Sequence, residues 1–120
     1  MDRKARIREY KDTPHPMGIY QIKNKVNGKI LIGSSVNLPA IINRCKAELK
    51  IGSYRNIVLQ QEWKQFGSEN FEFNELENLE PTDDPTYDPA EDLYVLEALW
   101  MEKLAPFGDK GYNKPRKPGA

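Results

Sequence analysis

One dipeptide, Asn27 followed by Gly28, constrains the fold of this chain more than any other feature. The segment before it, residues 18–25, alternates weakly and is rich in residues that favour strands, and the apolar residues 30–32 follow it. Asn and Gly tolerate the positive φ angles that a type I′ turn requires. The two flanking segments are therefore predicted to pair as an antiparallel hairpin about this turn.

Three helices and one more strand are predicted after the hairpin. A first helix is expected between Asn37, which suits an N-cap, and Gly52, which supplies a stop signal. A second helix is expected over residues 56–65, a third strand beginning near Phe71, and a last helix over residues 91–104. This order predicts an α+β fold with a three-stranded antiparallel sheet flanked by helices.

The chain is expected to form one domain, because its 120 residues can bury one core but hardly two. Residues 17–113 contain all the elements just predicted. The charged segment before them, residues 1–16, is expected to be an arm or a short helix. The basic segment after them, residues 114–120, is expected to be a disordered tail.

Several classes of protein are disfavoured by the sequence. No apolar run approaches the roughly 18 residues that a membrane helix needs, and the start of the chain is charged, unlike a signal peptide. These features predict a cytoplasmic protein without membrane contact. The single cysteine, Cys45, cannot form an internal disulfide, and with one histidine there is no Cys/His zinc cluster. Any metal would need carboxylate ligands.

The charge of the chain is balanced overall but unevenly distributed. The formal net charge is zero, which is not the strongly basic balance of a typical nucleic-acid-binding protein. Residues 1–70 carry 13 Lys and Arg against 6 Asp and Glu, whereas residues 71–120 carry 5 against 12. A basic face that meets phosphate and two solvated faces of opposite sign are both compatible with this pattern.

The acidic segment, residues 72–92, holds nine carboxylates and no Lys or Arg. It would repel a phosphate backbone, so it cannot be a DNA-binding face. A basic protein partner could dock on it. If the chain binds DNA, the contact is expected through Lys23, Lys25, Lys29, Arg44 and Lys46 of the first half. Lys114, Arg116 and Lys117 of the tail are further candidates, and the alternative for the tail is a solvated, disordered end.

The last predicted helix places a carboxylate, Glu97, at the edge of its apolar stripe. That stripe consists of Leu93, Leu96, Trp100 and Leu104. Because burying an unpaired charge is costly, Glu97 is expected to be paired with a base, bound to a metal, or placed in an open cleft. The alternative is a Glu that reaches past the stripe to solvent or to a nearby Lys.

Short motifs spread along the chain carry a further signal. They are Gly-Ile-Tyr at 18–20, Leu-Ile-Gly at 31–33, Gly-Ser-Ser at 33–35, Asn37 with Leu38, Glu97, and Gly-Tyr-Asn at 111–113. In their order and their spacing around the Asn-Gly turn they resemble the GIY-YIG nuclease superfamily, from about Met17 to Asn113. The resemblance implies that superfamily's sheet and helices, and a metal-dependent hydrolysis of DNA phosphodiesters.

The resemblance also implies roles for the matching residues. Tyr20 would help to activate the nucleophile, Glu97 would hold one divalent metal ion, Mg²⁺ or Mn²⁺, and Asn113 would be the closing asparagine of the motif. Lys23 matches a basic position that some members use. A hard cation held by a carboxylate helps to neutralise developing charge, to deprotonate the attacking water and to stabilise the leaving oxygen.

Three positions depart from the superfamily's pattern. Leu31 stands where the second tyrosine is expected, Ile41 where the helix carries its catalytic arginine, and Cys45 where a histidine often follows. A general acid or base is worth roughly 10²–10⁴ in rate and an arginine clamp roughly 10³–10⁵, so little turnover is expected. Arg44 is the candidate replacement for the lost arginine, although it lies about 60° around the helix from Ile41.

Three functional hypotheses follow. The first is a superfamily domain with impaired catalysis that binds nucleic acid or a protein partner. The second is an active, divalent-metal-dependent DNA endonuclease that uses Tyr20, Arg44 and Glu97, with Lys23 assisting. The third is a protein-interaction module that docks through its acidic segment or associates with itself. A structural explanation of the departures is also available, because Ile41 and Cys45 fall on the stripe that the first helix buries.

Overall fold

The computed structural model describes residues 15–80 and 82–114. Within them, strands and helices follow in the predicted order of strand, strand, helix, helix, strand, helix. Most of the predicted arm and tail falls outside the described residues, so those two boundaries stay predictions. None of the helices in residues 15–80 and 82–114 has the length and apolar character needed to cross a membrane.

The sheet has three antiparallel strands, as predicted, with β1 in the centre. β1 (Met17–Asn24) pairs with β2 (Ile30–Ser35) on one side and with β3 (Phe71–Leu79) on the other. β2 is therefore an edge strand. Its outer edge is partly covered by the end of the described chain, where Gly111 forms a parallel bridge to Ile30.

The hairpin between β1 and β2 is present, but its turn is not the two-residue type I′ turn that was predicted. Gly28 has a φ of 78°, whereas Asn27 is not among the residues with positive φ. The loop is wider, and the Gly28 amide donates to the Asn24 carbonyl at 2.8 Å. Two side-chain oxygens stabilise this wider loop: Asn24 Oδ1 accepts from the Val26 amide and Asn27 Oδ1 from the Lys29 amide.

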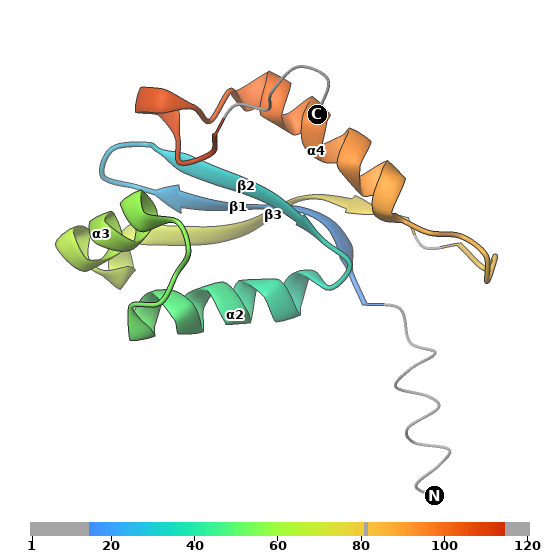
Figure 1. Ribbon diagram of the computed structural model, residues 1–120, viewed down its shortest axis with the longest axis horizontal. Helices are drawn as coiled ribbons and strands as arrows, with labels where there is room; N and C mark the ends of the chain where they lie inside the picture. The colour runs from blue at the N-terminus through green and yellow to red at the C-terminus, as the bar shows by residue number, and fades with distance from the viewer. Residues whose placement is uncertain (1–14, 81, 115–120) are drawn as a thin grey trace, which may run out of the picture.

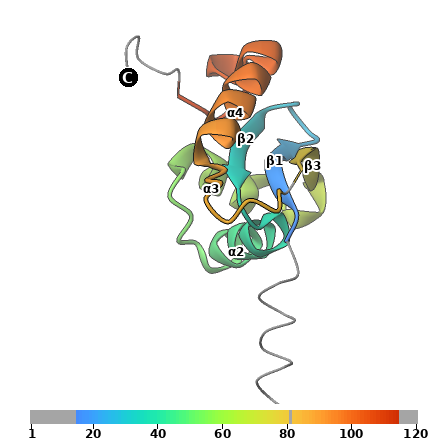
Figure 2. The ribbon, with the colours of Figure 1, turned by 90° about the vertical axis from the view of Figure 1, so that its right-hand side faces the viewer.

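The helices lie on both sides of the sheet. α2 (Leu38–Ile51) and α3 (Ile57–Phe66) occupy one side and α4 (Ala90–Leu104) the other, as Figures 1 and 2 show. The main core lies between the sheet and the pair α2 and α3. Its most deeply buried side chains are Ile22, Leu38, Leu49 and Leu59.

The starts of α2 and α3 follow the capping chemistry that their sequences predict. Asn37 Oδ1 accepts from the Ala40 amide at 3.2 Å, and Asn56 Oδ1 accepts from the Leu59 amide at 3.1 Å. α2 ends at Gly52, which has a φ of 96°. Asn56 has a second function, because its side-chain amide donates to the Tyr112 carbonyl at 2.8 Å. The start of α3 is thereby tied to the end of the described chain.

Candidate active-site cleft

A cleft of about 1000 Å³ opens along the outer edge of β2. Side chains and backbone from β2, from the start of α3, from α4 and from the end of the described chain line it. Its polar and charged lining side chains are Tyr20, Lys29, Ser34, Arg55, Asn56, Glu97, Tyr112, Asn113 and Lys114. The structure therefore brings three of the predicted catalytic residues, Tyr20, Glu97 and Asn113, to one cleft.

Tyr20 reaches this cleft because the residue opposite it in β2 has no side chain. Tyr20 pairs with Gly33 across the two strands. A β-carbon placed on Gly33 would overlap the ring and the hydroxyl of Tyr20. Gly33 therefore leaves the space that the tyrosine ring occupies, which links the two halves of the motif physically.

The Tyr20 hydroxyl lies in a largely buried environment. Burial raises its pKa to about 12, with smaller contributions in the same direction from Cys45 and Glu97, while the positive charge of Arg55 lowers it. At neutral pH Tyr20 is therefore a protonated phenol. It can donate a hydrogen bond to an anionic oxygen, but in this protonated state it cannot accept a proton as a general base does.

Cys45 and Tyr54 extend this buried group of weak acids. The Cys45 thiol lies 3.9 Å from the Tyr54 hydroxyl, and both side chains are in the core. Burial raises the pKa of the Cys45 thiol, and it raises the pKa of the Tyr54 hydroxyl as well. The cysteine that stands at the expected histidine position is therefore a neutral thiol near neutral pH and does not serve as a base there.

The other two departures also face apolar surroundings. Leu31 is 9% exposed, belongs to the core cluster, and lines the cleft. Ile41 packs on the same core from α2. The structural explanation of Ile41 and Cys45, namely that α2 buries them, agrees with these positions.

Arg44 does not lie where the predicted replacement for the lost arginine would be. It is exposed on α2, its Nε lies 3.7 Å from Glu48 Oε1 one turn further on, and it does not line the cleft. Lys23 and Lys25, two further predicted DNA contacts, do not line the cleft either. Lys46 lines a different groove.

Arg55 is the residue of the cleft that the sequence did not single out. It is exposed, it lies directly before the capping residue Asn56, and it lines the cleft. Its positive charge lowers the pKa of Tyr20, of Cys45 and of Tyr54, so it acts on all three buried groups. A basic residue in the loop between two predicted helices carried no signal by itself, because the path of that loop is set by tertiary contacts.

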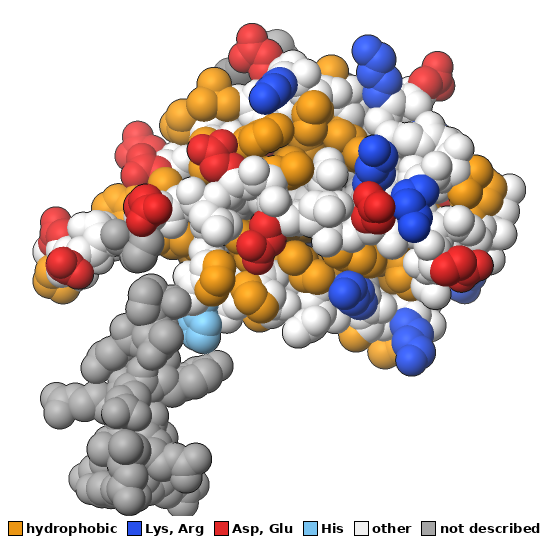
Figure 3. Space-filling view, turned by 180° about the vertical axis from the view of Figure 1, so that it is seen from behind, with side chains coloured by type: hydrophobic (Ala, Val, Ile, Leu, Met, Phe, Trp, Pro, Cys, Tyr) orange, Lys and Arg blue, Asp and Glu red, His pale blue; other side chains and the backbone are white. Residues whose placement is uncertain are grey.

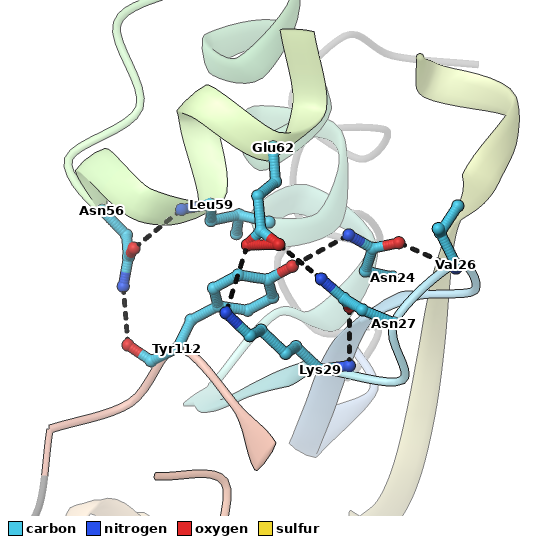
Figure 4. A network of polar contacts seen from close by, with 8 residues as sticks. All are labelled: Asn24, Val26, Asn27, Lys29, Asn56, Leu59, Glu62 and Tyr112. Carbon is cyan, nitrogen blue, oxygen red and sulfur yellow. Dashed lines mark hydrogen bonds and ion pairs between the residues drawn. The ribbon is translucent and has the colours of Figure 1, made fainter. Parts of the chain in front are cut away.

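A network of polar contacts supports the wall of the cleft beside α3 (Figure 4). The Tyr112 hydroxyl accepts from Asn24 Nδ2 at 3.1 Å, and burial raises the pKa of Tyr112 to about 12. The Lys29 ammonium lies 3.8 Å from Glu62 Oε2, and Asn27 donates to Oε1 of the same carboxylate. Lys29, predicted as a nucleic-acid contact, therefore already has an anionic partner within the protein.

Asn113 closes the cleft at the edge of β2. Its Oδ1 accepts from the Ile32 amide at 2.8 Å, and its Nδ2 donates to the Ile32 carbonyl at 2.9 Å. The side chain thus bonds both backbone groups of one residue on the edge strand, as a neighbouring strand would. These contacts fix the end of the described chain against the edge of β2.

Glu97 lies on the cleft side of α4 and is only partly exposed. Residues 15–80 and 82–114 contain no group of three His, Cys, Asp or Glu side chains that could hold a metal ion. Glu97 offers one carboxylate, and Mg²⁺ is commonly bound by one or two carboxylates together with substrate phosphates and water. The donor set therefore fits a cation that is shared with a bound phosphate.

Comparison with known proteins gives matches among solved structures. No family model matches the chain, and no curated protein matches it. The catalytic domain of the intron endonuclease I-TevI, solved as a mutant, is similar with a TM-score of 0.67 and 28% identity, over 82% of this chain and 92% of that one. A second structure, of the catalytic domain of the homing endonuclease I-TevI, gives a TM-score of 0.66 and 29% identity, over 83% and 99%.

Proposed function

Because the chain belongs to the GIY-YIG nuclease superfamily, we propose that it binds nucleic acid through the cleft and cuts it poorly or not at all. The observation that carries this proposal is the composition of the cleft. It contains the guanidinium of Arg55, the neutral phenol of Tyr20, the carboxylate of Glu97 and the apolar side chain of Leu31, with Lys29 and Lys114 also in its lining. Such a site can hold a phosphodiester, but once Glu97 holds a cation, neither Tyr20 nor Leu31 takes up a proton at neutral pH.

Each of the three polar residues has a distinct task in this proposal. Arg55 offsets the negative charge of the phosphate and can donate two parallel hydrogen bonds to it. Tyr20 donates a hydrogen bond from its protonated hydroxyl. Glu97 would hold a divalent cation against the same phosphate, and that cation would supply charge neutralisation when bound.

Efficient hydrolysis also requires proton transfer, and the residues beside Tyr20 do not support it. Leu31 has no exchangeable proton, and burial keeps the Cys45 thiol neutral. A positioned general acid or base contributes roughly 10²–10⁴ in rate, so its absence lowers turnover by about that factor.

The binding proposal is tested by comparing two exposed arginines. Arg55→Ala removes one cation of the cleft, and Arg44→Ala removes a cation that lies outside it. With fluorescently labelled duplex DNA, we expect Arg55→Ala to weaken binding and to reduce the slope of log affinity against log salt by about 0.9, the value for one phosphate contact. Arg44→Ala should leave both nearly unchanged. Equal effects of the two substitutions would contradict the proposal.

An active endonuclease is the second candidate function, and one observation favours it. Tyr20, Arg55 and Glu97 line the same cleft, so a cation stands near the tyrosine although the helix arginine is absent. Under this second hypothesis, Arg55 rather than Arg44 binds the phosphate. The two candidates differ in turnover and not in binding.

A protein partner for the acidic segment stays a separate proposal. Exposed carboxylates of β3 and of the following loop include Glu72, Glu75, Asp83 and Asp84. Glu77 is also engaged within the protein, because its Oε1 accepts from the Trp100 indole at 2.8 Å. A basic protein surface would complement this segment, and duplex DNA would not.

A further inference from the structure

A second groove, of about 740 Å³, lies at the opposite end of α3 from the cleft. The last turns of α2 and α3 and the start of β3 line it. α3 has 10 residues and is therefore about 15 Å long, and residues at its start line the cleft whereas residues at its end line the groove. No role is assigned to this groove by the superfamily motifs.

The floor of the groove is aromatic. Trp63 packs against Phe71 with ring centroids 5.1 Å apart and against Phe73 with ring centroids 6.1 Å apart. Phe71 is buried, whereas Trp63 and Phe73 keep part of their surfaces exposed. The groove therefore exposes part of the aromatic surface of Trp63 and Phe73 to solvent.

Three exposed lysines, Lys46, Lys50 and Lys64, form the rim. The Lys46 ammonium lies 5.1 Å from the centroid of the Phe73 ring. None of the described residues that line the groove is acidic, although the Glu69 carboxylate lies beside Gly67, which is part of the lining. The half of the molecule at the right of Figure 3 shows basic side chains, with acidic ones among them, around hydrophobic surface.

We propose that this groove binds a single-stranded segment of nucleic acid. Ammonium groups follow a phosphate backbone, and exposed aromatic rings stack on unpaired bases, which is the combination that single strands require. An acidic peptide would use the lysines but would leave the aromatic surface without a matching partner. Duplex nucleic acid would meet the lysines, but its bases are stacked on one another and cannot reach the floor.

The test uses Trp63 as the reporter. In a Trp100→Phe variant the fluorescence comes from Trp63 alone, because the chain has two tryptophans. Oligothymidylate, oligouridylate, a duplex of the same length and heparin are titrated in turn. We expect both single strands to quench the fluorescence, and the duplex and heparin to give little quenching, because neither stacks unpaired bases on Trp63 in the groove. Equal quenching by heparin, or none by the single strands, would overturn the proposal.

Charge variants give an independent measurement that does not disturb the core. A Lys46→Ala and Lys64→Ala double variant should lower the slope of log affinity against log salt by roughly 1.4, since each contact to a single strand contributes about 0.7. Lys103→Ala, an exposed lysine over Trp100 outside the groove, is the matched control. Glu69→Gln should tighten binding. A double variant that behaves like Lys103→Ala would contradict the assignment.

A Phe73→Leu variant separates stacking from attraction of charge. It should lose affinity for oligothymidylate and keep its affinity for heparin, with folding checked by thermal melting. Equal losses of affinity for oligothymidylate and heparin would show that the groove attracts only charge, and would overturn the stacking proposal. This inference is separable from the proposed function, because Arg55 lines only the cleft and the substituted groove residues line only the groove. If Arg55→Ala weakens binding of duplex DNA and the groove variants leave binding of single strands unchanged, only the groove proposal fails.

Discussion

Tyr20 shows how burial decides what a side chain can do in this cleft. The sequence predicted that Tyr20, Glu97 and Asn113 belong to the site, and the structure places all three around one cleft. Their chemical states required the fold: the phenol is protonated because it is buried, and the asparagine amide is occupied by the backbone of Ile32. Residue type alone does not reveal either fact.

The sequence did not reveal which arginine lines the cleft, Arg44 or Arg55. Arg44 was the candidate replacement for the missing arginine because it lies one turn from Ile41, but it is exposed on α2, pairs with Glu48 and does not line the cleft. Arg55 lies in the loop between α2 and α3, so the spacing of residues along a helix could not place it beside the cleft. Its position depends on the loop between α2 and α3, which the hydrogen bond from Asn56 to Tyr112 anchors to a segment far along the chain.

The buried tyrosines predict how stability depends on alkaline pH. Burial raises the pKa of Tyr20 and of Tyr112 to about 12, and it also raises the pKa of Tyr54. The unperturbed value is near 10. Because folding favours the protonated hydroxyls, their stabilising contribution is complete below about pH 10 and is lost as the pH rises toward 12.

Urea unfolding at a series of pH values measures this effect, together with the ultraviolet absorbance of tyrosinate. We expect the free energy of unfolding to fall between about pH 10 and pH 12, and Tyr54→Phe to fall less steeply. Ionisation of all tyrosines near pH 10 in the folded protein would contradict the burial argument.

At the scale of elements, Gly33 predicts a specific coupling between β1 and β2. Gly33→Ala places a methyl group where the Tyr20 ring lies, so it should destabilise the fold by about 1–3 kcal/mol. In a Tyr20→Leu background the overlapping ring atoms are gone, and most of this cost should disappear. Urea unfolding of the four proteins of this cycle measures the coupling. Additive effects would show that Gly33 and Tyr20 are independent.

The bonds from Asn113 to the edge of β2 are expected to stabilise the fold. Asn113→Ala leaves the Ile32 amide and carbonyl without their side-chain partner, so we expect a loss of about 1–3 kcal/mol in the free energy of unfolding. Asn74→Ala, on an exposed position of β3, is the matched control and should change little. A loss of DNA binding without a loss of stability would instead favour a direct catalytic or binding role for Asn113.

The elements themselves were largely predictable, and their irregularities were not. Hydrophobic periodicity and caps located α2, α3 and α4 within a residue or so of their observed bounds. The hairpin loop is wider than predicted because Asn24 and Asn27 bond nearby amides. β3 carries an irregularity where Ile19 pairs with Glu77 and Tyr20 with Glu75, and nothing in the local sequence indicated it.

At the scale of the whole molecule, the order of elements sufficed to predict the α+β class and the three-stranded sheet. The motifs predicted three residues of the cleft, but the full lining of the cleft and the existence of the groove could not be predicted, because each is built from segments that are distant in sequence. The cleft joins β2, the start of α3, α4 and the end of the described chain, and the groove joins α2, α3 and β3. Only the folded arrangement brings these side chains together.

Nicking of supercoiled plasmid, with Mg²⁺ or Mn²⁺ supplied, tests most directly whether the cleft binds without efficient cutting. We predict that the purified protein shows no nicking above that of its Glu97→Ala variant, while both proteins keep their fold. Metal-dependent nicking by the original protein that disappears in Glu97→Ala would contradict the account and establish an active nuclease.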